Sequence, residues 1–325
     1  ANRIARWNGS SWSALGSNGT NGPVNALAFS GSDLYVGGDF SAAGGLPANN
    51  LARWNGGVWS VLGDAAQNGV DGAVFALRVV GSDLYVGGVY RGIGTLVANF
   101  IARWNGSSWS ALGADEANGV SSTVFAIGAS GSQLYLGGYF DQAGGLPANF
   151  AAHWNGRVWS ALGSGVGNGV NNVISALAIL GDDLYAGGRF SQAGGQIANF
   201  IARWNGSTWS PLLGGGNGVN SDVLALGVLG NQVYVGGYFS QAGGAPAALI
   251  ASWNGSVWST LGAGLGGGDY PSVQSIAAIG SDLYVGGEFI EAGGQPAFKI
   301  ARWNGTSWSA LGSGNANGVS RGDFI

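Results

Sequence analysis

The triplet Trp-Asn-Gly recurs seven times at an almost constant spacing, and this repeat limits the possible folds more than any other feature of the chain. The triplets begin at Trp7, Trp54, Trp104, Trp154, Trp204, Trp253 and Trp303, with spacings of 47, 50, 50, 50, 49 and 50 residues. A second phrase, Leu-Tyr-Val-Gly-Gly or a close variant, is centred on Tyr35, Tyr85, Tyr135, Tyr185, Tyr234 and Tyr284. A fixed period of about 20–50 residues indicates a repeat protein, in which neighbouring units bury a continuous core.

Each unit reads as four short strands. The first two are illustrated by Thr123–Ser130 and Leu134–Phe140, and the last two by Phe100–Trp104 and Trp109–Leu112. Turns such as "GSQ" and "NGSS" and a loop such as "DQAGGLPAN" separate them. Short apolar runs between Gly and Asn turns are typical of all-β proteins, and no stretch keeps a helical period. Because four-stranded units arranged radially form a β-propeller, the sequence predicts an all-β propeller fold.

The fourteen tryptophans all belong to the Trp-Asn-Gly phrase. Asn-Gly favours a tight hairpin because both residues tolerate positive φ, and the two flanking indoles can face each other across the strands. An aromatic binding site repeated in every unit is the alternative. We predict a structural role for all of them: Trp7, Trp12, Trp54, Trp59, Trp104, Trp109, Trp154, Trp159, Trp204, Trp209, Trp253, Trp258, Trp303 and Trp308.

The repeat resembles the kelch motif. The residues that carry this resemblance in one unit are Tyr85, Gly87, Gly88, Trp104, Asn105, Trp109 and Leu112. The wording "ARWNGSSWSALG" with "LYVGGxFxxAGG" is also similar to repeats of secreted and surface bacterial proteins, which in turn resemble the fungal cortical cell-polarity marker family. The resemblance implies a propeller. Together with a single Lys and a charged fraction of 9%, it leads us to expect an extracellular or cell-surface location.

The two chain ends leave the number of blades open. We expect one domain over residues 1–325, with a closing hairpin at 1–22, six full repeats at 23–312 and the start of a further strand at 313–325. Seven blades with an incomplete closing blade are favoured, and six blades with an extra hairpin are the alternative. Further residues after Ile325, or a neighbouring chain, would complete the seventh blade. Its unpaired strand edge is therefore a predicted site for self-association or for a partner chain. The first residue, Ala1 rather than Met, suggests a processed or excised chain.

Composition argues against several classes of function. The net charge is −4 and no basic cluster occurs, which argues against nucleic acid, and no apolar run approaches the roughly 18 residues of a membrane helix. Cys is absent and His153 is the single histidine, in the position that Arg fills in other units. A catalytic triad would depend on that residue. The kelch resemblance also brings in copper oxidases, but these use a Cys-linked Tyr and His ligands, and this chain has no Cys and one His. We therefore expect no enzyme activity, no metal and no cofactor.

Variation is concentrated in the loops that follow the second and fourth strands, which leave a blade on the same face. Directly after Gly-Gly the chain has Asp39, Val89, Tyr139, Arg189, Tyr238 and Glu288. Acidic residues add to this loop variation, and free drift of exposed loops is the alternative explanation: Asp64, Asp71, Glu116, Asp141, Asp269 and Glu291. Because variation on a fixed scaffold is typical of a binding surface, we predict ligand-binding roles for five residues: Asp39, Tyr139, Arg189, Tyr238 and Glu288.

These observations favour a non-enzymatic, secreted or cell-surface propeller that binds glycan or protein ligands at several sites. The alternative is a structural subunit of an extracellular assembly, surface layer or larger complex. Glycoside hydrolysis by paired carboxylates is the weakest hypothesis, because the acids at Asp33, Asp83, Asp183 and Asp282 recur in a "GSD"-type turn and nothing marks two acids as a pair.

Overall fold

Repeated four-stranded antiparallel sheets make up this protein, in a computed structural model that describes residues 2–16, 18–63, 68–312 and 318–319. The chain forms two compact units, divided between Ala161 and Leu162. Asp64 and most of the strand predicted at 313–325 lie outside the described residues. The all-β prediction is confirmed, and the sheets are those of a β-propeller-like repeat fold. The single domain stays a prediction.

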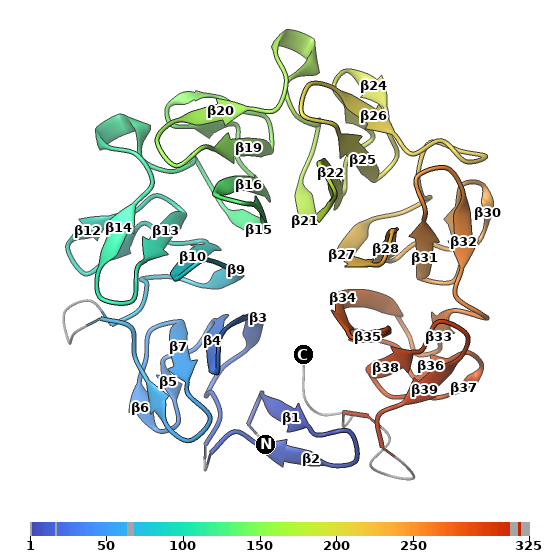
Figure 1. Cartoon of the computed structure of the whole chain (residues 1–325), viewed down its shortest axis with the longest axis horizontal. Coiled ribbons are helices and arrows are strands. Elements are labelled where there is room, and N and C mark those ends of the chain that lie inside the picture. Colours follow the sequence, from blue (N-terminus) through green and yellow to red (C-terminus); the bar gives the residue numbers. More distant parts are fainter. Residues whose placement is uncertain (1, 17, 64–67, 313–317, 320–325) are drawn as a thin grey trace. The chain divides into compact units, whose positions relative to one another are not determined.

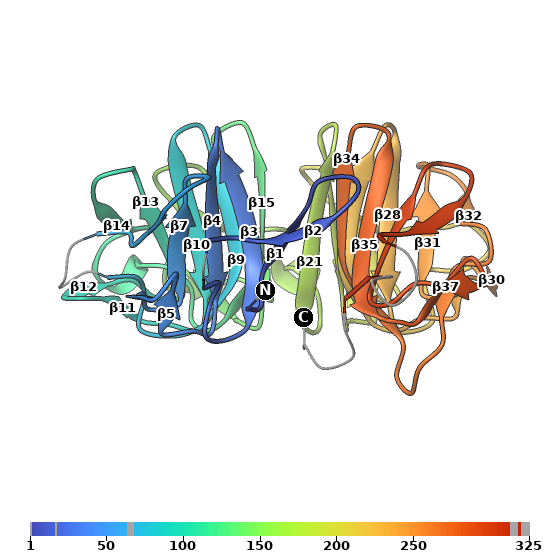
Figure 2. The ribbon, with the colours of Figure 1, turned by 90° about the horizontal axis from the view of Figure 1, so that it is seen from below.

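Unit 1 contains the N-terminal Trp-Asn-Gly hairpin and three four-stranded sheets (Figures 1 and 2). The hairpin is β1 (Ala5–Trp7) with β2 (Trp12–Ala14). Sheet 1 is β3 (Val24–Ser30), β4 (Asp33–Gly38), β7 (Leu51–Trp54) and β8 (Trp59–Ser60). Sheet 2 is β9 (Val74–Val80), β10 (Asp83–Gly88), β13 (Ile101–Trp104) and β14 (Trp109–Ala111). Sheet 3 is β15 (Val124–Ser130), β16 (Gln133–Gly138), β19 (Ala151–Trp154) and β20 (Trp159–Ala161).

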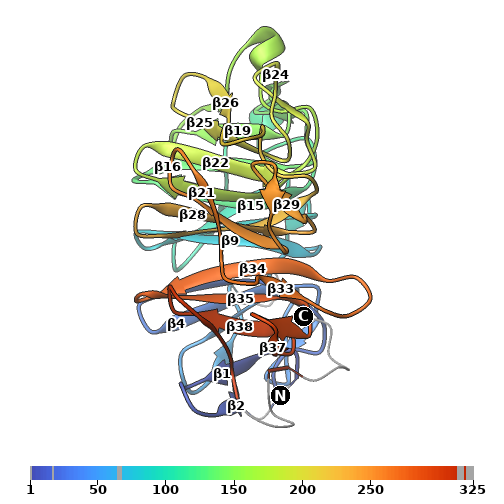
Figure 3. The ribbon, with the colours of Figure 1, turned by 90° about the vertical axis from the view of Figure 1, so that its right-hand side faces the viewer.

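Unit 2 contains three more four-stranded sheets of the same order, and Figure 3 shows β34, β35 and β38 of the last one side by side. Sheet 4 is β21 (Ile174–Leu180), β22 (Asp183–Gly188), β25 (Ile201–Trp204) and β26 (Trp209–Pro211). Sheet 5 is β27 (Val223–Leu229), β28 (Gln232–Gly237), β31 (Ile250–Trp253) and β32 (Trp258–Thr260). Sheet 6 is β34 (Ser272–Ile279), β35 (Asp282–Glu288), β38 (Ile300–Trp303) and β39 (Trp308–Ala310).

The loop after each second strand, for which the sequence predicted no strands, folds into a small hairpin. Adjacent glycines such as Gly144 (φ 58°) and Gly145 (φ 74°) have the two positive φ angles of a type I′ turn. In unit 1 these hairpins are β5 (Ala42–Ala43) with β6 (Leu46–Pro47), β11 (Gly92–Ile93) with β12 (Leu96–Val97), and β17 (Gln142–Ala143) with β18 (Leu146–Pro147). In unit 2 they are β23 (Gln192–Ala193) with β24 (Gln196–Ile197), β29 (Gln241–Ala242) with β30 (Ala245–Pro246), and β36 (Glu291–Ala292) with β37 (Gln295–Pro296), with β33 (Leu265–Gly266) alongside β36. Two short 3-10 helices follow fourth strands: η1 (Asp115–Ala117) comes after β14 of sheet 2, and η2 (Gly165–Gly167) comes after β20 of sheet 3.

Each Trp-Asn-Gly hairpin closes with the predicted pair of facing indoles. Trp104 lies opposite Trp109 in the register, with ring centroids 5.2 Å apart at 50°, and all seven pairs fall between 5.0 and 5.5 Å. Tilted aromatic pairs add about 0.5–1.5 kcal/mol beyond area burial. The turn differs from the expectation that Asn105 and Gly106 both have positive φ, because only Gly106 does. Asn105 acts through its side chain instead, since its Oδ1 accepts the backbone N–H groups of Ser107 and Ser108.

The second tryptophan of a hairpin also ties its sheet to the preceding repeat. The Trp209 indole N–H donates to the Leu162 carbonyl oxygen at 2.9 Å, and the Trp159 indole N–H donates to that of Leu112 at 2.8 Å. Trp59, Trp109 and Trp308 make the same contact with Leu15, Leu62 and Leu261. These residues therefore serve two purposes: they pair within the hairpin and they connect consecutive repeats.

The Gly-Gly of each second strand lets neighbouring backbones and sheets pack closely. A Cβ atom on Gly236 of sheet 5 would lie 2.2 Å from Val273 Cγ1 of sheet 6, and one on Gly237 would lie 2.0 Å from the Asp222 carbonyl oxygen. In unit 1 a Cβ atom on Gly37 would meet Val74 of sheet 2 at 2.4 Å in the same way. The two glycines thus recur because the first makes room for the next sheet and the second for the first strand of its own sheet.

The recurrent Asp of the "GSD" turns is a strand residue that forms an ion pair, which corrects the sequence-based assignment to a turn. Asp83 begins β10, and its Oδ2 lies 2.8 Å from Arg103 Nε of β13. Equivalent pairs join Asp33 to Arg53, Asp183 to Arg203 and Asp282 to Arg302. The arginines are more than two-fifths exposed, and such surface pairs contribute at most about 1 kcal/mol.

His153 occupies the arginine position of this pair in sheet 3. Its Nε2 lies 2.7 Å from Gln133 Oε1, and its Nδ1 lies 3.1 Å from Ser160 Oγ. Burial lowers the pKa of this imidazole. Gln133 replaces the acid where His153 replaces the arginine, so both partners of the pair change together and the contact between the two strands is kept.

Candidate functional site

The residue after Gly-Gly lies beside a second variable residue, which comes directly before the third strand. In sheet 3 the backbone N–H of Gly138 donates to the Phe150 carbonyl, and the N–H of Phe150 donates to the Phe140 carbonyl, at 3.2 and 2.8 Å. Tyr139 is held between these bonds, next to Phe150. We call the two residues the variable pair. The six pairs are Asp39 with Asn50, Val89 with Phe100, Tyr139 with Phe150, Arg189 with Phe200, Tyr238 with Leu249, and Glu288 with Lys299.

The second residue of every variable pair has a left-handed backbone. Its φ lies between 60° and 65° in all six sheets, as at Phe150 (60°) and Leu249 (65°). Non-glycine residues with such φ are uncommon and bulky ones are outliers. The conformation turns the chain into the third strand while the side chain stays next to the exposed first residue. In each sheet the fold therefore places two variable side chains next to each other, the second of which is buried or half-buried.

Two of the five predicted site residues are held in ion pairs within the chain. Arg189 Nη2 lies 2.7 Å from Asp222 Oδ2, and the hydrogen bond to this carboxylate raises the pKa of the guanidinium. Glu288 Oε1 lies 3.2 Å from Lys299 Nζ, its partner in the variable pair. Asp39 is exposed. Ion pairing therefore distinguishes Arg189 and Glu288 from the two tyrosines.

Tyr139 lines a cavity of about 270 Å³ in unit 1. Its side chain is 57% exposed, and its ring centroid lies 6.0 Å from that of Phe150 at 57°. Ser121 Oγ donates to Asp141 Oδ1 at 2.7 Å at the edge of this cavity and accepts the backbone N–H groups of Asp141 and Gln142. The lining therefore combines three aromatic residues, Tyr139, Phe140 and Phe150, with a carboxylate and two hydroxyl groups.

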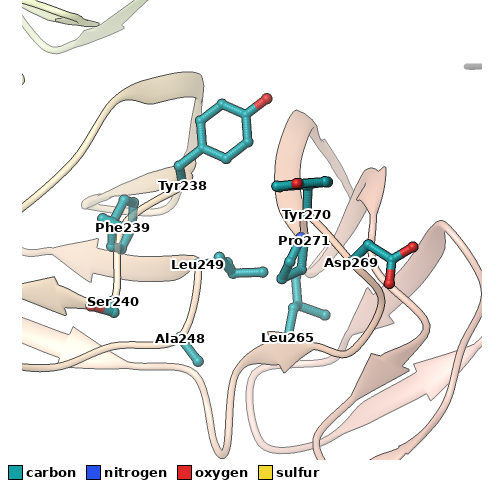
Figure 4. Close-up of a pocket in the computed structure, with 9 residues that line it drawn as sticks. All are labelled: Tyr238, Phe239, Ser240, Ala248, Leu249, Leu265, Asp269, Tyr270 and Pro271. Carbon is teal, nitrogen blue, oxygen red and sulfur yellow. The ribbon is translucent and has the colours of Figure 1, made fainter.

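Tyr238 lines a second cavity, of about 430 Å³, in unit 2 (Figure 4). Tyr238 and Tyr270 stand on opposite sides of it, and Leu249 lies between them, close to Pro271 (Figure 4). Tyr270 is 86% exposed and Tyr238 is 45% exposed. Asp269 and Ser240 add a carboxylate and a hydroxyl group to a lining that is otherwise apolar. This volume is within the roughly 300–1,000 Å³ of small-molecule sites.

Asp71, one of the acids in the variable loops, has a structural role in the described chain. Its Oδ1 accepts the backbone N–H groups of Arg91 and Gly92 at 2.9 and 3.1 Å. Asn21 and Asn171 make the same two bonds in their sheets. Asp71 thus varies a recurrent hydrogen-bonding position that fixes the loop. The described part of Glu116 is its backbone, in η1.

The cavity residues that sequence reasoning missed include Phe150, Leu249 and Tyr270. Tyr270 could have been found, because it is the one tyrosine of ten that lies outside the Tyr-x-Gly-Gly-x-aromatic phrase. Phe150 follows "AN" and Leu249 follows "AA" at the same varied position of the repeat, yet their proximity to the tyrosines depends on the left-handed backbone, which no sequence pattern indicated.

Two further observations concern metal binding and membrane spans among the described residues. Within the described ranges, no group of three or more His, Cys, Asp and Glu side chains is placed to hold a metal ion. Among those same residues, none of the helices has the length and apolar character needed to cross a membrane.

Comparisons with known proteins relate this chain to others through its fold. No family model matches, and no curated protein matches. The structure of the computationally designed Ika8 protein is similar over 86% of this chain and 74% of its own, with a TM-score of 0.50 and 16% identity. The extracellular domain of a putative hybrid two-component system from B. thetaiotaomicron is similar over 90% of this chain, with a TM-score of 0.53 and 14% identity. The match covers 34%, about a third, of that second structure's length. At these identities the likeness concerns the fold.

Proposed function

We propose that this protein is a non-enzymatic extracellular or cell-surface binding module that holds glycan or protein ligands at several of its variable pairs. One observation carries the proposal: Tyr139 and Tyr238 occupy the same repeat position, each is exposed, and each lines a cavity with a carboxylate residue. Tyrosine offers a large apolar face with a polar tip, which suits it to recognition surfaces. The similarity to an extracellular domain supports the location.

Repetition of the site favours many weak contacts over one strong one. The two tyrosine cavities are built on the same backbone geometry, in which the second residue of the pair, Phe150 or Leu249, has positive φ. Ligands that carry repeated groups, such as glycan chains or protein arrays, would engage several sites at once. Linked sites of modest affinity gain avidity in this way without new contacts.

The non-enzymatic part of the proposal is supported by the surroundings of the ionisable groups. His153 is bonded to Gln133 and Ser160 in a position that belongs to the repeat. Glu288 and Arg189 are paired with Lys299 and Asp222. A general acid or base needs a pKa matched to its task, and these groups are instead engaged in contacts that hold the sheets.

Replacement of Tyr139 and Tyr238 by alanine is expected to weaken ligand binding about tenfold per site, the usual cost of truncating an aromatic anchor. The measurement is a glycan array with the full chain, followed by titration of any sugar or protein found. Val89→Ala is the matched control, because Val89 has the same repeat position in sheet 2. Equal binding by the tyrosine variants and the parent chain would place the ligand elsewhere.

A second candidate function, a structural subunit of a larger assembly, is favoured by an apolar sheet face. Leu27 and Phe29 of β3 are 52% and 69% exposed. The equivalent residues of sheet 2, Leu77 and Val79, pack in a cluster with Tyr35 and Leu51 of sheet 1. Sheet 1 thus leaves exposed the two positions that, in sheet 2, pack against the preceding sheet. The seventh, incomplete blade and its completion by another chain belong to this proposal.

The double variant Leu27→Ser, Phe29→Ser is expected to reduce concentration-dependent self-association, because it removes the apolar area that a second copy would cover. Light scattering across a hundredfold range of protein concentration measures this directly. Val158→Ser, at an exposed turn valine, controls for lost surface hydrophobicity. A chain that stays monomeric at every concentration before mutation would count against the assembly hypothesis and leave the binding hypothesis intact.

A further inference from the structure

One aromatic ring of the variable pairs is already covered by a positively charged side chain of the same chain. In sheet 2 the Arg91 guanidinium carbon lies 5.4 Å from the centroid of the Phe100 ring. Phe100 is the second residue of its variable pair, and Arg91 lies two residues after the first, Val89. A guanidinium within about 6 Å of a ring centroid is attracted by the electron-rich face of the ring. In sheet 2, therefore, a guanidinium group occupies the place over the aromatic ring of the variable pair.

Sheet 3 has the same ring and the opposite charge. Phe150 replaces Phe100 in the repeat, Tyr139 replaces Val89, and Asp141 replaces Arg91. The place over the ring is a cavity of about 270 Å³, lined by Tyr139, Phe140, Phe150, Asp141, Ser121 and Ser122. The substitution of an acid for a base both opens this space and supplies a negative charge beside it.

We propose that the Tyr139–Phe150 cavity binds the side chain of an arginine from a basic segment of a partner protein. This inference rests on the proposed function, and it names the ligand class of one site. The guanidinium would lie over the Phe150 and Tyr139 rings, as Arg91 lies over Phe100, and its N–H groups would donate to the Asp141 carboxylate. Arginine is preferred to lysine because a planar guanidinium both stacks on rings and matches a carboxylate with paired donors.

The charge of the whole chain supports a basic partner. The net charge is −4 with a sequence pI near 4.8, so a basic segment is attracted to the protein before it docks. A neutral sugar would stack its C–H groups on the aromatic rings, but it carries no positive charge to pair with the Asp141 carboxylate. The observations therefore favour a guanidinium over a glycan at this cavity.

The test is an NMR titration of the full, isotopically labelled chain with the capped peptide Gly-Gly-Arg-Gly-Gly and with the same peptide carrying citrulline. Citrulline keeps the planar shape of arginine and lacks its charge. The amide signals of Ser121, Ser122, Asp141 and Phe150 are expected to shift with the arginine peptide. Binding of the citrulline peptide is expected to be at least fivefold weaker, because charge-assisted bonds are roughly twice as strong as neutral ones.

Two variants assign the effect to this cavity. Asp141→Arg places in sheet 3 the arginine that sheet 2 has at this position, so its own guanidinium is expected to cover Phe150 and abolish the shifts. Arg91→Asp uncovers Phe100 and is expected to add a second set of shifts in sheet 2, which keeps the test decisive if the first variant folds poorly. Equal binding of the two peptides, or arginine shifts that persist in folded Asp141→Arg, would overturn the inference.

Neutral oligosaccharides added to the same labelled chain separate this inference from the proposed function. Shifts at Tyr139 with a sugar and none with the arginine peptide would overturn the guanidinium site and leave the binding module standing. No shift at either tyrosine cavity with peptides or sugars would count against both. Shifts with the arginine peptide alone would support both.

Discussion

Replacing Gly237 by alanine is expected to destabilise unit 2 by about 3 kcal/mol, the upper part of the range for overpacked positions. The added Cβ atom would lie 2.0 Å from the Asp222 carbonyl oxygen and 3.0 Å from Val223 Cα. Both are backbone atoms at the start of β27, so no side-chain rotation relieves the clash and the two strands must separate. For a unit of this size the melting temperature should fall by roughly 6–12 °C.

Gly266→Ala is the matched control. Gly266 lies in the same unit, its φ is not positive, and a Cβ atom there would meet nothing within 4 Å. The control should be neutral or slightly stabilising, by up to about 1 kcal/mol, since alanine restricts the unfolded chain. Calorimetric unfolding of both variants provides the measurement. If Gly237→Ala melts with the control, close packing is not the reason that the second glycine recurs.

The repeat unit was readable from the sequence because local rules agree with one another throughout. Strand, turn and hairpin signals all point to four short strands, and the Trp pairs lie where the Asn-Gly turn predicts. The reasons for some recurrent residues were not readable. Gly236 and Gly237 looked like the end of a strand, whereas their function depends on Val273 and Asp222, which are far from them in sequence or belong to another sheet.

The candidate site was predicted in part. Position after Gly-Gly was recognised as variable, and Tyr139 and Tyr238 both line cavities there. Nothing in the sequence separated them from Arg189 and Glu288, because ion pairing with Asp222 and Lys299 is a matter of three-dimensional proximity. The sequence alone does not distinguish a charged side chain that is paired within the protein from one that is available to a ligand.

The Trp-Asn-Gly hairpin of sheet 5 provides a natural test of the indole contact between repeats. Trp258 Nε1 is buried and has no hydrogen-bond partner, unlike the equivalent atom of Trp209. Gly63, Gly113 and Gly163 follow the accepting leucine in sheets 1 to 3, with φ between 101° and 107°. Leu213 has this position in sheet 4, where the repeat is also one residue shorter. A leucine rarely adopts such φ, so the preceding carbonyl is not turned toward Trp258.

Trp209→Phe is therefore expected to cost about 2–3 kcal/mol, of which about 1 kcal/mol is the lost hydrogen bond to the Leu162 carbonyl and the rest is packing of a side chain that is almost fully buried. Trp258→Phe removes an unsatisfied buried N–H, whose desolvation costs about 1–3 kcal/mol, and this gain should offset its packing loss. Both variants keep an aromatic pair in the hairpin, with Trp204 or Trp253 as partner. Denaturant unfolding followed by far-ultraviolet circular dichroism compares the two without relying on indole fluorescence. Equal losses would mean that the tryptophans act through pairing alone, and a larger loss at Trp209 would establish them as the bonds between repeats.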